Sequence, residues 1–183
     1  AGNEAAVMDS QNRALELSML LTVPAAVALA VVPGPIVSVL FERGAFKGGD
    51  TRAVSAALAI FALGLPGFVL QKVFQPGYFA REDTKTPMRF TAWSLGVNTA
   101  GSIALFFLFP MIGLSPHLGI AVATVVGGWL SVVLLYRGLV RRGHFAADRR
   151  LRYALPMILL ASVVMAMALV AGTHQLAPWL AVG

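Results

Sequence analysis

Five long apolar runs dominate this sequence and set the strongest limit on how the chain can fold. Lys72 is the only charged residue inside any of them, and they cover residues 17–40, 53–80, 90–112, 118–136 and 153–171. A helix of about 20 mostly apolar residues is long enough to cross the hydrocarbon core of a bilayer. We therefore predict an all-α fold, a polytopic transmembrane helical bundle.

The composition supports a lipid-facing surface. Charged residues make up 12% of the chain and hydrophobic residues 58%, whereas a soluble domain carries roughly 25% charged residues. The net charge of +6 does not indicate a nucleic-acid partner, because the cations lie between the apolar runs without interleaved aromatic residues. The chain has no cysteine, which excludes disulfides.

The gaps between the runs predict the organisation of the chain. Residues 1–16 are expected to form a cytoplasmic amphipathic lead-in along the membrane surface, although an ordinary solvated linker fits them nearly as well. Residues 17–136 are expected to hold four transmembrane helices, at about 17–40, 52–80, 87–112 and 117–136. A basic cytoplasmic loop is expected at 137–152. A fifth helix and the start of a truncated sixth are expected in 153–183.

Positive charge is unevenly shared between alternate gaps. One set of gaps holds ten Lys and Arg residues, namely 13, 81, 85, 89, 137, 141, 142, 149, 150 and 152. The other set holds three, at 43, 47 and 52. Because short cytoplasmic loops are enriched in Lys and Arg, the N-terminus and the 137–152 loop are predicted to be cytoplasmic.

Small residues at four-residue spacing predict close helix packing. Gly119, Ala123 and Gly127 form one such series, and Gly96 with Ala100 forms another. Glycine and alanine at this spacing allow helix backbones to approach one another in a membrane.

No constellation of residues in the sequence indicates catalysis or a metal site. Every Asp and Glu lies at or beyond the end of an apolar run, and the three histidines are far apart in the sequence. General acid–base chemistry or zinc binding within the membrane needs such groups clustered. We therefore expect no catalytic residue, metal or cofactor, and we interpret Glu82-Asp83 as a solvated turn.

Four polar residues in the second run are the candidate binding residues. Gln71, Gln75 and Tyr78 are spaced at i, i+4 and i+7, on one helical face, and Lys72 borders that face. A cation within a membrane span usually faces a bundle interior or a water-filled cavity. Lys72 is also close enough to the end of the run to reach the interface as an anchor, so cavity-facing and anchoring roles both remain open.

The segments LFERGAF at 40–46 and ALGLPGFVLQKVFQPGYFAREDTKTP at 62–87 resemble the MurJ/MviN family of lipid II flippases, in the multidrug/oligosaccharidyl-lipid/polysaccharide exporter superfamily. The motif residues that carry the resemblance are Gly44, Phe46, Pro76, Arg81, Asp83, Thr84, Thr86 and Pro87. Thr86 followed by Pro87 also fits an N-cap and the first position of a helix. Lys47 stands where relatives usually have a threonine, which weakens a capping box there.

The resemblance implies a part of the C-terminal lobe of a MurJ-like, MATE-like flippase fold, from helix nine to the start of helix fourteen. It implies that the protein exports lipid II, the lipid-linked peptidoglycan precursor, across the bacterial inner membrane by alternating access. Lipid II, membrane lipids and the missing N-terminal lobe of the same chain are then the expected partners. A polysaccharide-lipid or drug exporter of the superfamily, a membrane-embedded enzyme of lipid metabolism and a structural membrane scaffold are the alternatives.

Overall fold

Six α-helices make up the part of the chain that the computed structural model describes, residues 2–43, 46 and 48–180. They are α1 (Gly2–Val31), α2 (Pro33–Phe41), α3 (Gly48–Phe79), α4 (Lys85–Met111), α5 (Pro116–Arg141) and α6 (Arg149–Leu180). These described residues include no strand. All helices except α2 are long and apolar enough to cross a membrane. The predicted all-α, polytopic membrane fold is therefore confirmed.

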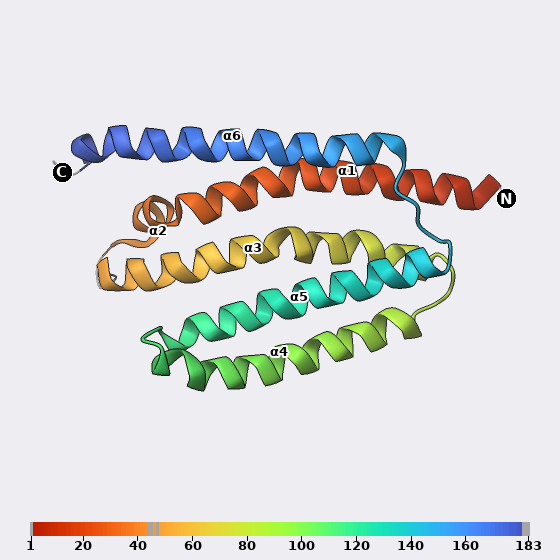
Figure 1. Cartoon of the computed structure of the whole chain (residues 1–183), viewed down its shortest axis with the longest axis horizontal. Coiled ribbons are helices and arrows are strands. Elements are labelled where there is room, and N and C mark those ends of the chain that lie inside the picture. Colours follow the sequence, from red (N-terminus) through yellow and green to blue (C-terminus); the bar gives the residue numbers. More distant parts are fainter. Residues whose placement is uncertain (1, 44–45, 47, 181–183) are drawn as a thin grey trace.

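The five long helices lie side by side in one row rather than in a closed bundle (Figure 1). Their order is α6, α1, α3, α5, α4, and α2 packs against α3 beside the end of α1. Within the described residues, α6 contacts no helix except α1. The two flanking helices, α4 and α6, therefore expose most of their apolar surface.

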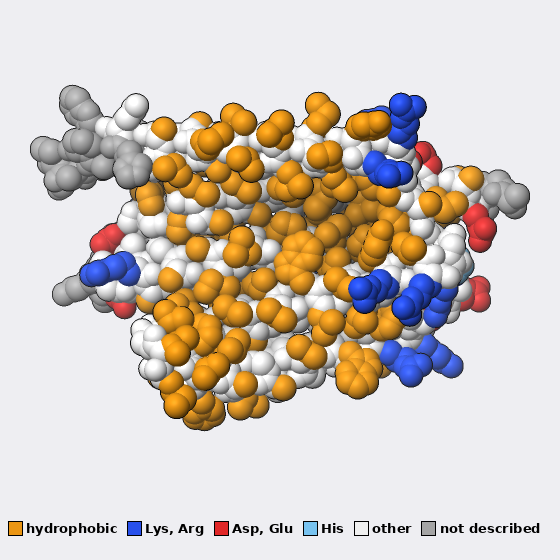
Figure 2. All heavy atoms as spheres, viewed as in Figure 1, with side chains coloured by type: hydrophobic (Ala, Val, Ile, Leu, Met, Phe, Trp, Pro, Cys, Tyr) orange, Lys and Arg blue, Asp and Glu red, His pale blue; other side chains and the backbone are white. Residues whose placement is uncertain are grey.

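The connections alternate between the two ends of the row. The α3–α4 and α5–α6 connections lie at the same end as the N-terminus of α1, and the α4–α5 turn lies at the opposite end (Figure 1). On the face that Figure 2 shows, most Lys and Arg side chains gather at the end with the N-terminus. The charge asymmetry of the sequence thus becomes an asymmetry between the two ends of the fold.

The first helix differs from the expected lead-in followed by a span at 17–40. α1 is one continuous helix from Gly2 to Val31, and Gln11, Asn12 and Leu15 are buried within the fold. The expected span is broken before Pro33, where Val32 leaves the helical region with φ −124° and ψ 47°. Proline lacks an amide hydrogen and disfavours helical geometry in the residue before it, so a separate helix, α2, begins there.

The C-terminal part of the chain also differs from expectation. We expected a fifth helix over the apolar run 153–171 and the start of a separate, truncated sixth before residue 183. The structure has a single helix, α6, from Arg149 to Leu180. Hydropathy falls after Ala171, but the next proline along the chain is Pro178. Nothing in the backbone therefore forces the helix to end near Ala171.

Close packing of α4 on α5 depends on the predicted glycine series. A Cβ added to Gly119 would lie 2.8 Å from the backbone of Leu105, and one added to Gly127 would lie 3.0 Å from Cβ of Asn98. This part of the prediction is confirmed. The prediction for Gly96 and Ala100 is not confirmed, because among the described residues no neighbouring helix has an atom within 4 Å of a Cβ built on Gly96.

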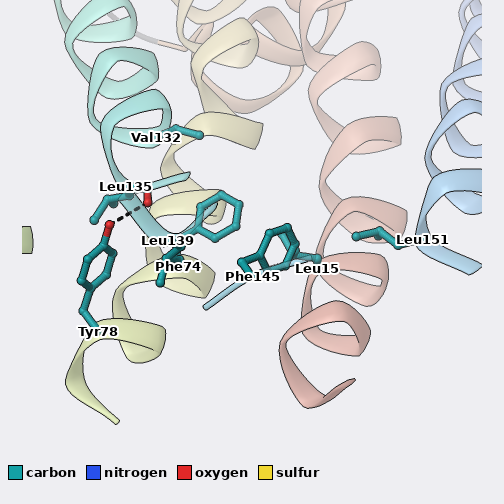
Figure 3. Packing of buried hydrophobic residues seen from close by; sticks show 8 residues of the cluster. All are labelled: Leu15, Phe74, Tyr78, Val132, Leu135, Leu139, Phe145 and Leu151. Atoms are coloured by element: carbon teal, nitrogen blue, oxygen red, sulfur yellow. Dashed lines mark hydrogen bonds between the residues drawn. The ribbon is translucent and has the colours of Figure 1, made fainter. Parts of the chain in front are cut away.

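A buried cluster joins the helices near the end that carries the N-terminus (Figure 3). It draws on α1, α3, α5, the α5–α6 connection and α6, and its members are Leu15, Phe74, Tyr78, Val132, Leu135, Leu139, Phe145 and Leu151. Phe145 packs edge-on against Phe74, with ring centroids 5.7 Å apart. The cluster therefore fixes the α5–α6 connection against the helices that carry the candidate polar residues.

Candidate functional site

Two of the four candidate polar residues hold α3 against α5. The Gln71 side-chain amide donates a hydrogen bond to the Gly128 carbonyl at 3.1 Å. The Tyr78 side chain is 1% exposed, and its hydroxyl donates to the Leu135 carbonyl at 2.8 Å (Figure 3). Both polar groups are thus paired with the α5 backbone.

Lys72 faces a different neighbour from Gln71. Consecutive residues of an α-helix are about 100° apart around its axis, so Lys72 lies on the side of α3 that meets α1. It is exposed there, on a cavity of about 550 Å³ that Ser10, Gln11 and Gly77 also line. The cation therefore lies at an open groove between α1 and α3.

Gln75 occupies a third environment. It is half-buried and lines a cavity of about 370 Å³ between α3 and α4, together with Phe79, Thr84 and Met88. Gln71, Gln75 and Tyr78 do lie along one face of α3, as their spacing predicted. That face contacts α5 through Gln71 and Tyr78 and borders α4 at Gln75. The four candidates consequently do not share one cavity within the described residues.

The groove at Lys72 contains a polar residue that sequence reasoning missed. Gln11 is 7% exposed, and its amide nitrogen lies 3.4 Å from the Val73 carbonyl. Its oxygen Oε1 is buried and has no hydrogen-bond partner among the described residues. Gly77 allows this approach, because a Cβ at that position would lie 2.7 Å from the Gln11 amide nitrogen. Gln11 was overlooked because residues 1–16 were expected to lie outside the bundle.

The motif residues of the α3–α4 connection form an ion-paired turn. The Thr86 amide donates to the Asp83 carboxylate at 3.0 Å, and the Arg142 guanidinium lies 2.5 Å from the same carboxylate. Arg142 also donates to the Thr86 hydroxyl at 3.1 Å. The hydrogen bonds from Thr86, and then Arg142, lower the pKa of Asp83 from 3.8 to about 2. Asp83 is thus a partner of the end of α5 and not only part of a solvated turn.

The helix after this turn begins earlier than expected. We expected Thr86 as the N-cap and Pro87 as the first helical residue, whereas α4 begins at Lys85, with Thr84 before it. The Asp83 side chain satisfies the Thr86 amide, a role that N-cap carboxylates commonly have. Pro87 is buried, within the first turn. A proline in the first turn is tolerated, since the first amides of a helix have no partner inside it.

The other motif residues have local structural contacts. Arg81 donates to the Gly77 carbonyl at 2.7 Å, and Pro76 lies inside α3, where its carbonyl accepts from the Ala80 amide at 2.9 Å. The Phe46 ring lies 6.3 Å from that of Phe41. Gly44 and Lys47, which also belong to the motif region, lie outside the described residues.

A second polar cluster, also missed from sequence, ties the first half of α1 to the start of α6 and to the connection before it. Arg13 pairs with Asp148, and Glu16 pairs with Arg150 at 3.0 Å. The Asn12 side chain donates to the Ala146 carbonyl at 3.0 Å. These groups are far apart in the sequence, so spacing alone gives no signal for them.

A wide apolar groove opens on the face that Figure 2 shows, between α6 and α5. Its volume is about 340 Å³, and α1 and α3 form its floor through residues such as Met19 and Phe74. Trp129, Val133 and Tyr136 of α5 line one wall. Neither this groove nor the polar ones contains a cluster of metal ligands, because the described residues hold no group of three His, Cys, Asp or Glu side chains that could bind an ion.

Comparisons with known proteins agree with one another. The family model described as "Lipid II flippase MurJ" matches residues 1–182. The chain is 49% identical over 175 residues to a probable lipid II flippase MurJ of Rhizobium meliloti (strain 1021), and 47% identical over 173 residues to one of Rhizobium tropici. These matches cover 96% and 94% of this chain, but 31% of each relative, so the chain spans about a third of their length.

A solved structure gives the same result. The chain is similar to a lipid II flippase MurJ in an inward closed conformation, with a TM-score of 0.71 and 26% sequence identity, over 91% of this chain and 33% of that one. The open row of helices, the α3–α4 motif and these matches lead to one family. The chain belongs to the lipid II flippase MurJ family.

Proposed function

We propose that this chain is part of a flippase that exports lipid II across the bacterial inner membrane by alternating access. The match of residues 1–182 to the family model is the observation that carries the proposal. The chain spans 31% of its relatives' length, which supports the further proposal that the substrate pathway is shared with an N-terminal lobe of the same protein. No covalent bond is made or broken in this process. The protein lowers the barrier to moving a charged headgroup through lipid.

The physical task is to replace water around a diphosphate while keeping it away from acyl chains. Polar and cationic side chains in a cavity at membrane depth can do this. The groove between α1 and α3 is the best candidate in this chain, because Lys72 supplies a cation there and Gln11 an unpaired buried oxygen. We propose that Lys72 holds the anionic headgroup on the cytoplasmic side, and that Gln11 accepts a hydrogen bond from a hydroxyl or amide of the same headgroup.

Gln71, Gln75 and Tyr78 have supporting roles in this proposal. Gln71 and Tyr78 hold α3 to α5 through hydrogen bonds of 3.1 and 2.8 Å and so fix the orientation of the helix that bears Lys72. Gln75 lines the neighbouring groove between α3 and α4. It can contribute to the cavity if that groove is continuous with the rest of the substrate pathway.

Complementation tests this function. The complete gene should restore growth to a strain depleted of its own lipid II flippase, and Lys72→Gln should impair that rescue at equal expression. Lys72→Arg should keep more function because it retains the charge. The matched control is Lys85→Gln, which removes an exposed lysine at the start of α4, away from the groove. Full rescue by Lys72→Gln would show that Lys72 is an interfacial anchor, and failure of the unmodified gene would refute the flippase assignment itself.

A further inference from the structure

The connection between α5 and α6, residues 142–148, is held against the other helices along its length. At its start the Arg142 guanidinium contacts the Asp83 carboxylate and the Thr86 hydroxyl. In its middle Phe145 is 5% exposed, inside the buried cluster (Figure 3). The connection therefore has a fixed position at the end of the fold that carries the N-terminus (Figure 1).

Asn12 of α1 holds the other end of this connection. Its side chain donates a hydrogen bond to the Ala146 carbonyl at 3.0 Å and accepts one from the Asp148 amide at 3.3 Å. Asn12 is 3% exposed, so one buried side chain satisfies two backbone groups of the connection. Because a backbone group that is buried without a partner is costly, these two hydrogen bonds fix the connection on α1.

Ion pairs join the first turn of α6 to α1 at the same place. The Asp148 carboxylate accepts a hydrogen bond at 2.7 Å from an amide in the first turn of α6, as an N-cap residue does, and it also pairs with Arg13. Arg150 pairs at 3.0 Å with Glu16, whose side chain is 15% exposed. The side chains of Asn12, Arg13 and Glu16 thus form a clamp on the start of α6.

The rest of α6 has no comparable attachment. Among the described residues, the side-chain hydrogen bonds of α6 beyond Arg150 are those of Ser162 and Thr173, and both go to carbonyls of α6 itself. α1 is the one described helix that α6 contacts, and the groove of about 340 Å³ separates α6 from α5. Polar contacts therefore hold one end of α6, whereas the rest is held by packing against a single neighbour.

Pro156 gives α6 a place to bend just beyond the clamp. It lies inside the helix, and proline has no amide hydrogen, so the Arg152 carbonyl receives no helical hydrogen bond from it. Bends sharper than about 20° in helices occur mostly at prolines or similar interruptions. We propose that the clamp fixes the first turn of α6 on α1 and that the part of α6 beyond Pro156 swings about this point, which widens and narrows the groove between α5 and α6.

This movement does not depend on which substrate the protein exports, and helix geometry sets its size. Gln71 and Tyr78 hold α3 to α5 through hydrogen bonds, so α5 stays in place while α6 moves. Ala171 lies 15 residues beyond Pro156, which corresponds to about 22 Å along a helix. A swing of about 20° about Pro156 therefore displaces Ala171 by about 8 Å.

Distances between spin labels test the proposal, in the complete protein with no other cysteine and in nanodiscs. A far pair is labelled on Ala171→Cys and Ser115→Cys, at the end of the fold away from the clamp. A near pair is labelled on Arg152→Cys and Met88→Cys, at the end with the clamp. All four positions are exposed. Distances from double electron–electron resonance should spread over about 8 Å more in the far pair than in the near pair, and an equal spread would overturn the proposal.

Two substitutions test the bend and the clamp separately. Pro156→Ala restores the helical amide and should narrow the far-pair distances to the spread of the near pair. Arg13→Gln removes the ionic partner of Asp148 and should broaden the near-pair distances. The matched control is Arg149→Gln, which removes an equal charge from an exposed position that has no ion pair among the described residues, and it should leave the near pair unchanged. Far-pair distances that stay broad in Pro156→Ala, or equal effects of Arg13→Gln and Arg149→Gln, would each refute the proposal.

Discussion

The contact between Gly138 and Tyr78 gives the sharpest test of how α3 packs on α5. A Cβ added to Gly138 would overlap the Tyr78 hydroxyl oxygen and would lie 3.2 Å from Cε2 of Phe90. Tyr78 is buried and donates its hydroxyl hydrogen to the Leu135 carbonyl (Figure 3). Gly138→Ala should therefore displace the tyrosine and break this hydrogen bond.

The expected cost combines three terms. Overpacking a close contact costs about 1–3 kcal/mol, and the lost hydrogen bond adds about 1 kcal/mol. Alanine recovers about 1 kcal/mol through its higher helix propensity. Gly138→Ala should therefore lower the free energy of unfolding by about 1–3 kcal/mol. Tyr78→Phe, which removes only the hydroxyl, should lower it by about 1 kcal/mol.

A double-mutant cycle separates this explanation from general destabilisation. In Tyr78→Phe the oxygen that Cβ would overlap is absent, so Gly138→Ala should cost about 1–2 kcal/mol less in that background than in the original protein. Unfolding can be followed by circular dichroism during titration with sodium dodecyl sulfate in mixed micelles. Gly96→Ala is the control, because a Cβ at Gly96 has open space around it. Additive costs, or a Gly138→Ala cost equal to that of Gly96→Ala, would refute the proposed packing.

Two further predictions concern charge. The pKa of Asp83 is lower in the folded protein, about 2 against 3.8, so the ionised carboxylate stabilises the fold above about pH 4 and this effect is lost as the pH falls toward 2. Asp83→Asn should therefore lower the melting temperature at pH 7, and the difference in melting temperature from the original protein should narrow on acidification. A difference that does not depend on pH would contradict the ion-paired turn. Single cysteines at Gly48 or Ser115 should react with an impermeant thiol reagent from outside intact cells, whereas one at Gly143 should react only after permeabilisation; the opposite pattern would reverse the proposed topology.

The fold class was predictable because apolar runs of membrane length leave little choice of structure. The close approach of α4 and α5 was predictable too, since Gly119 and Gly127 leave room for a facing backbone. The break between α1 and α2 at Val32 was not predicted, because residues 17–40 are apolar without interruption. Hydropathy does not register that Pro33 lacks an amide hydrogen. Hydropathy likewise suggested an end to the last helix near Ala171, although hydropathy alone does not end a helix.

The candidate site was only partly accessible from the sequence. Spacing placed Gln71, Gln75 and Tyr78 on one face of a helix, but it does not reveal which neighbours that face meets. Two of these residues are paired with α5, and Lys72 lies toward α1. Gln11 contacts the α3 backbone at Val73, 62 residues further along the chain, and this tertiary contact is one that no local pattern encodes.

We propose that this chain contributes one part of a two-lobe flippase, and reconstitution into liposomes measures that directly. Liposomes that contain lipid II are prepared with the complete protein, with residues 1–183 alone or with no protein, and the lipid II that becomes accessible from outside is measured over time. We expect saturable flipping by the complete protein. We also expect that lipid II in the presence of residues 1–183 alone stays as protected as in empty liposomes. Saturable flipping by residues 1–183 alone, or none by the complete protein, would contradict the proposed two-lobe flippase.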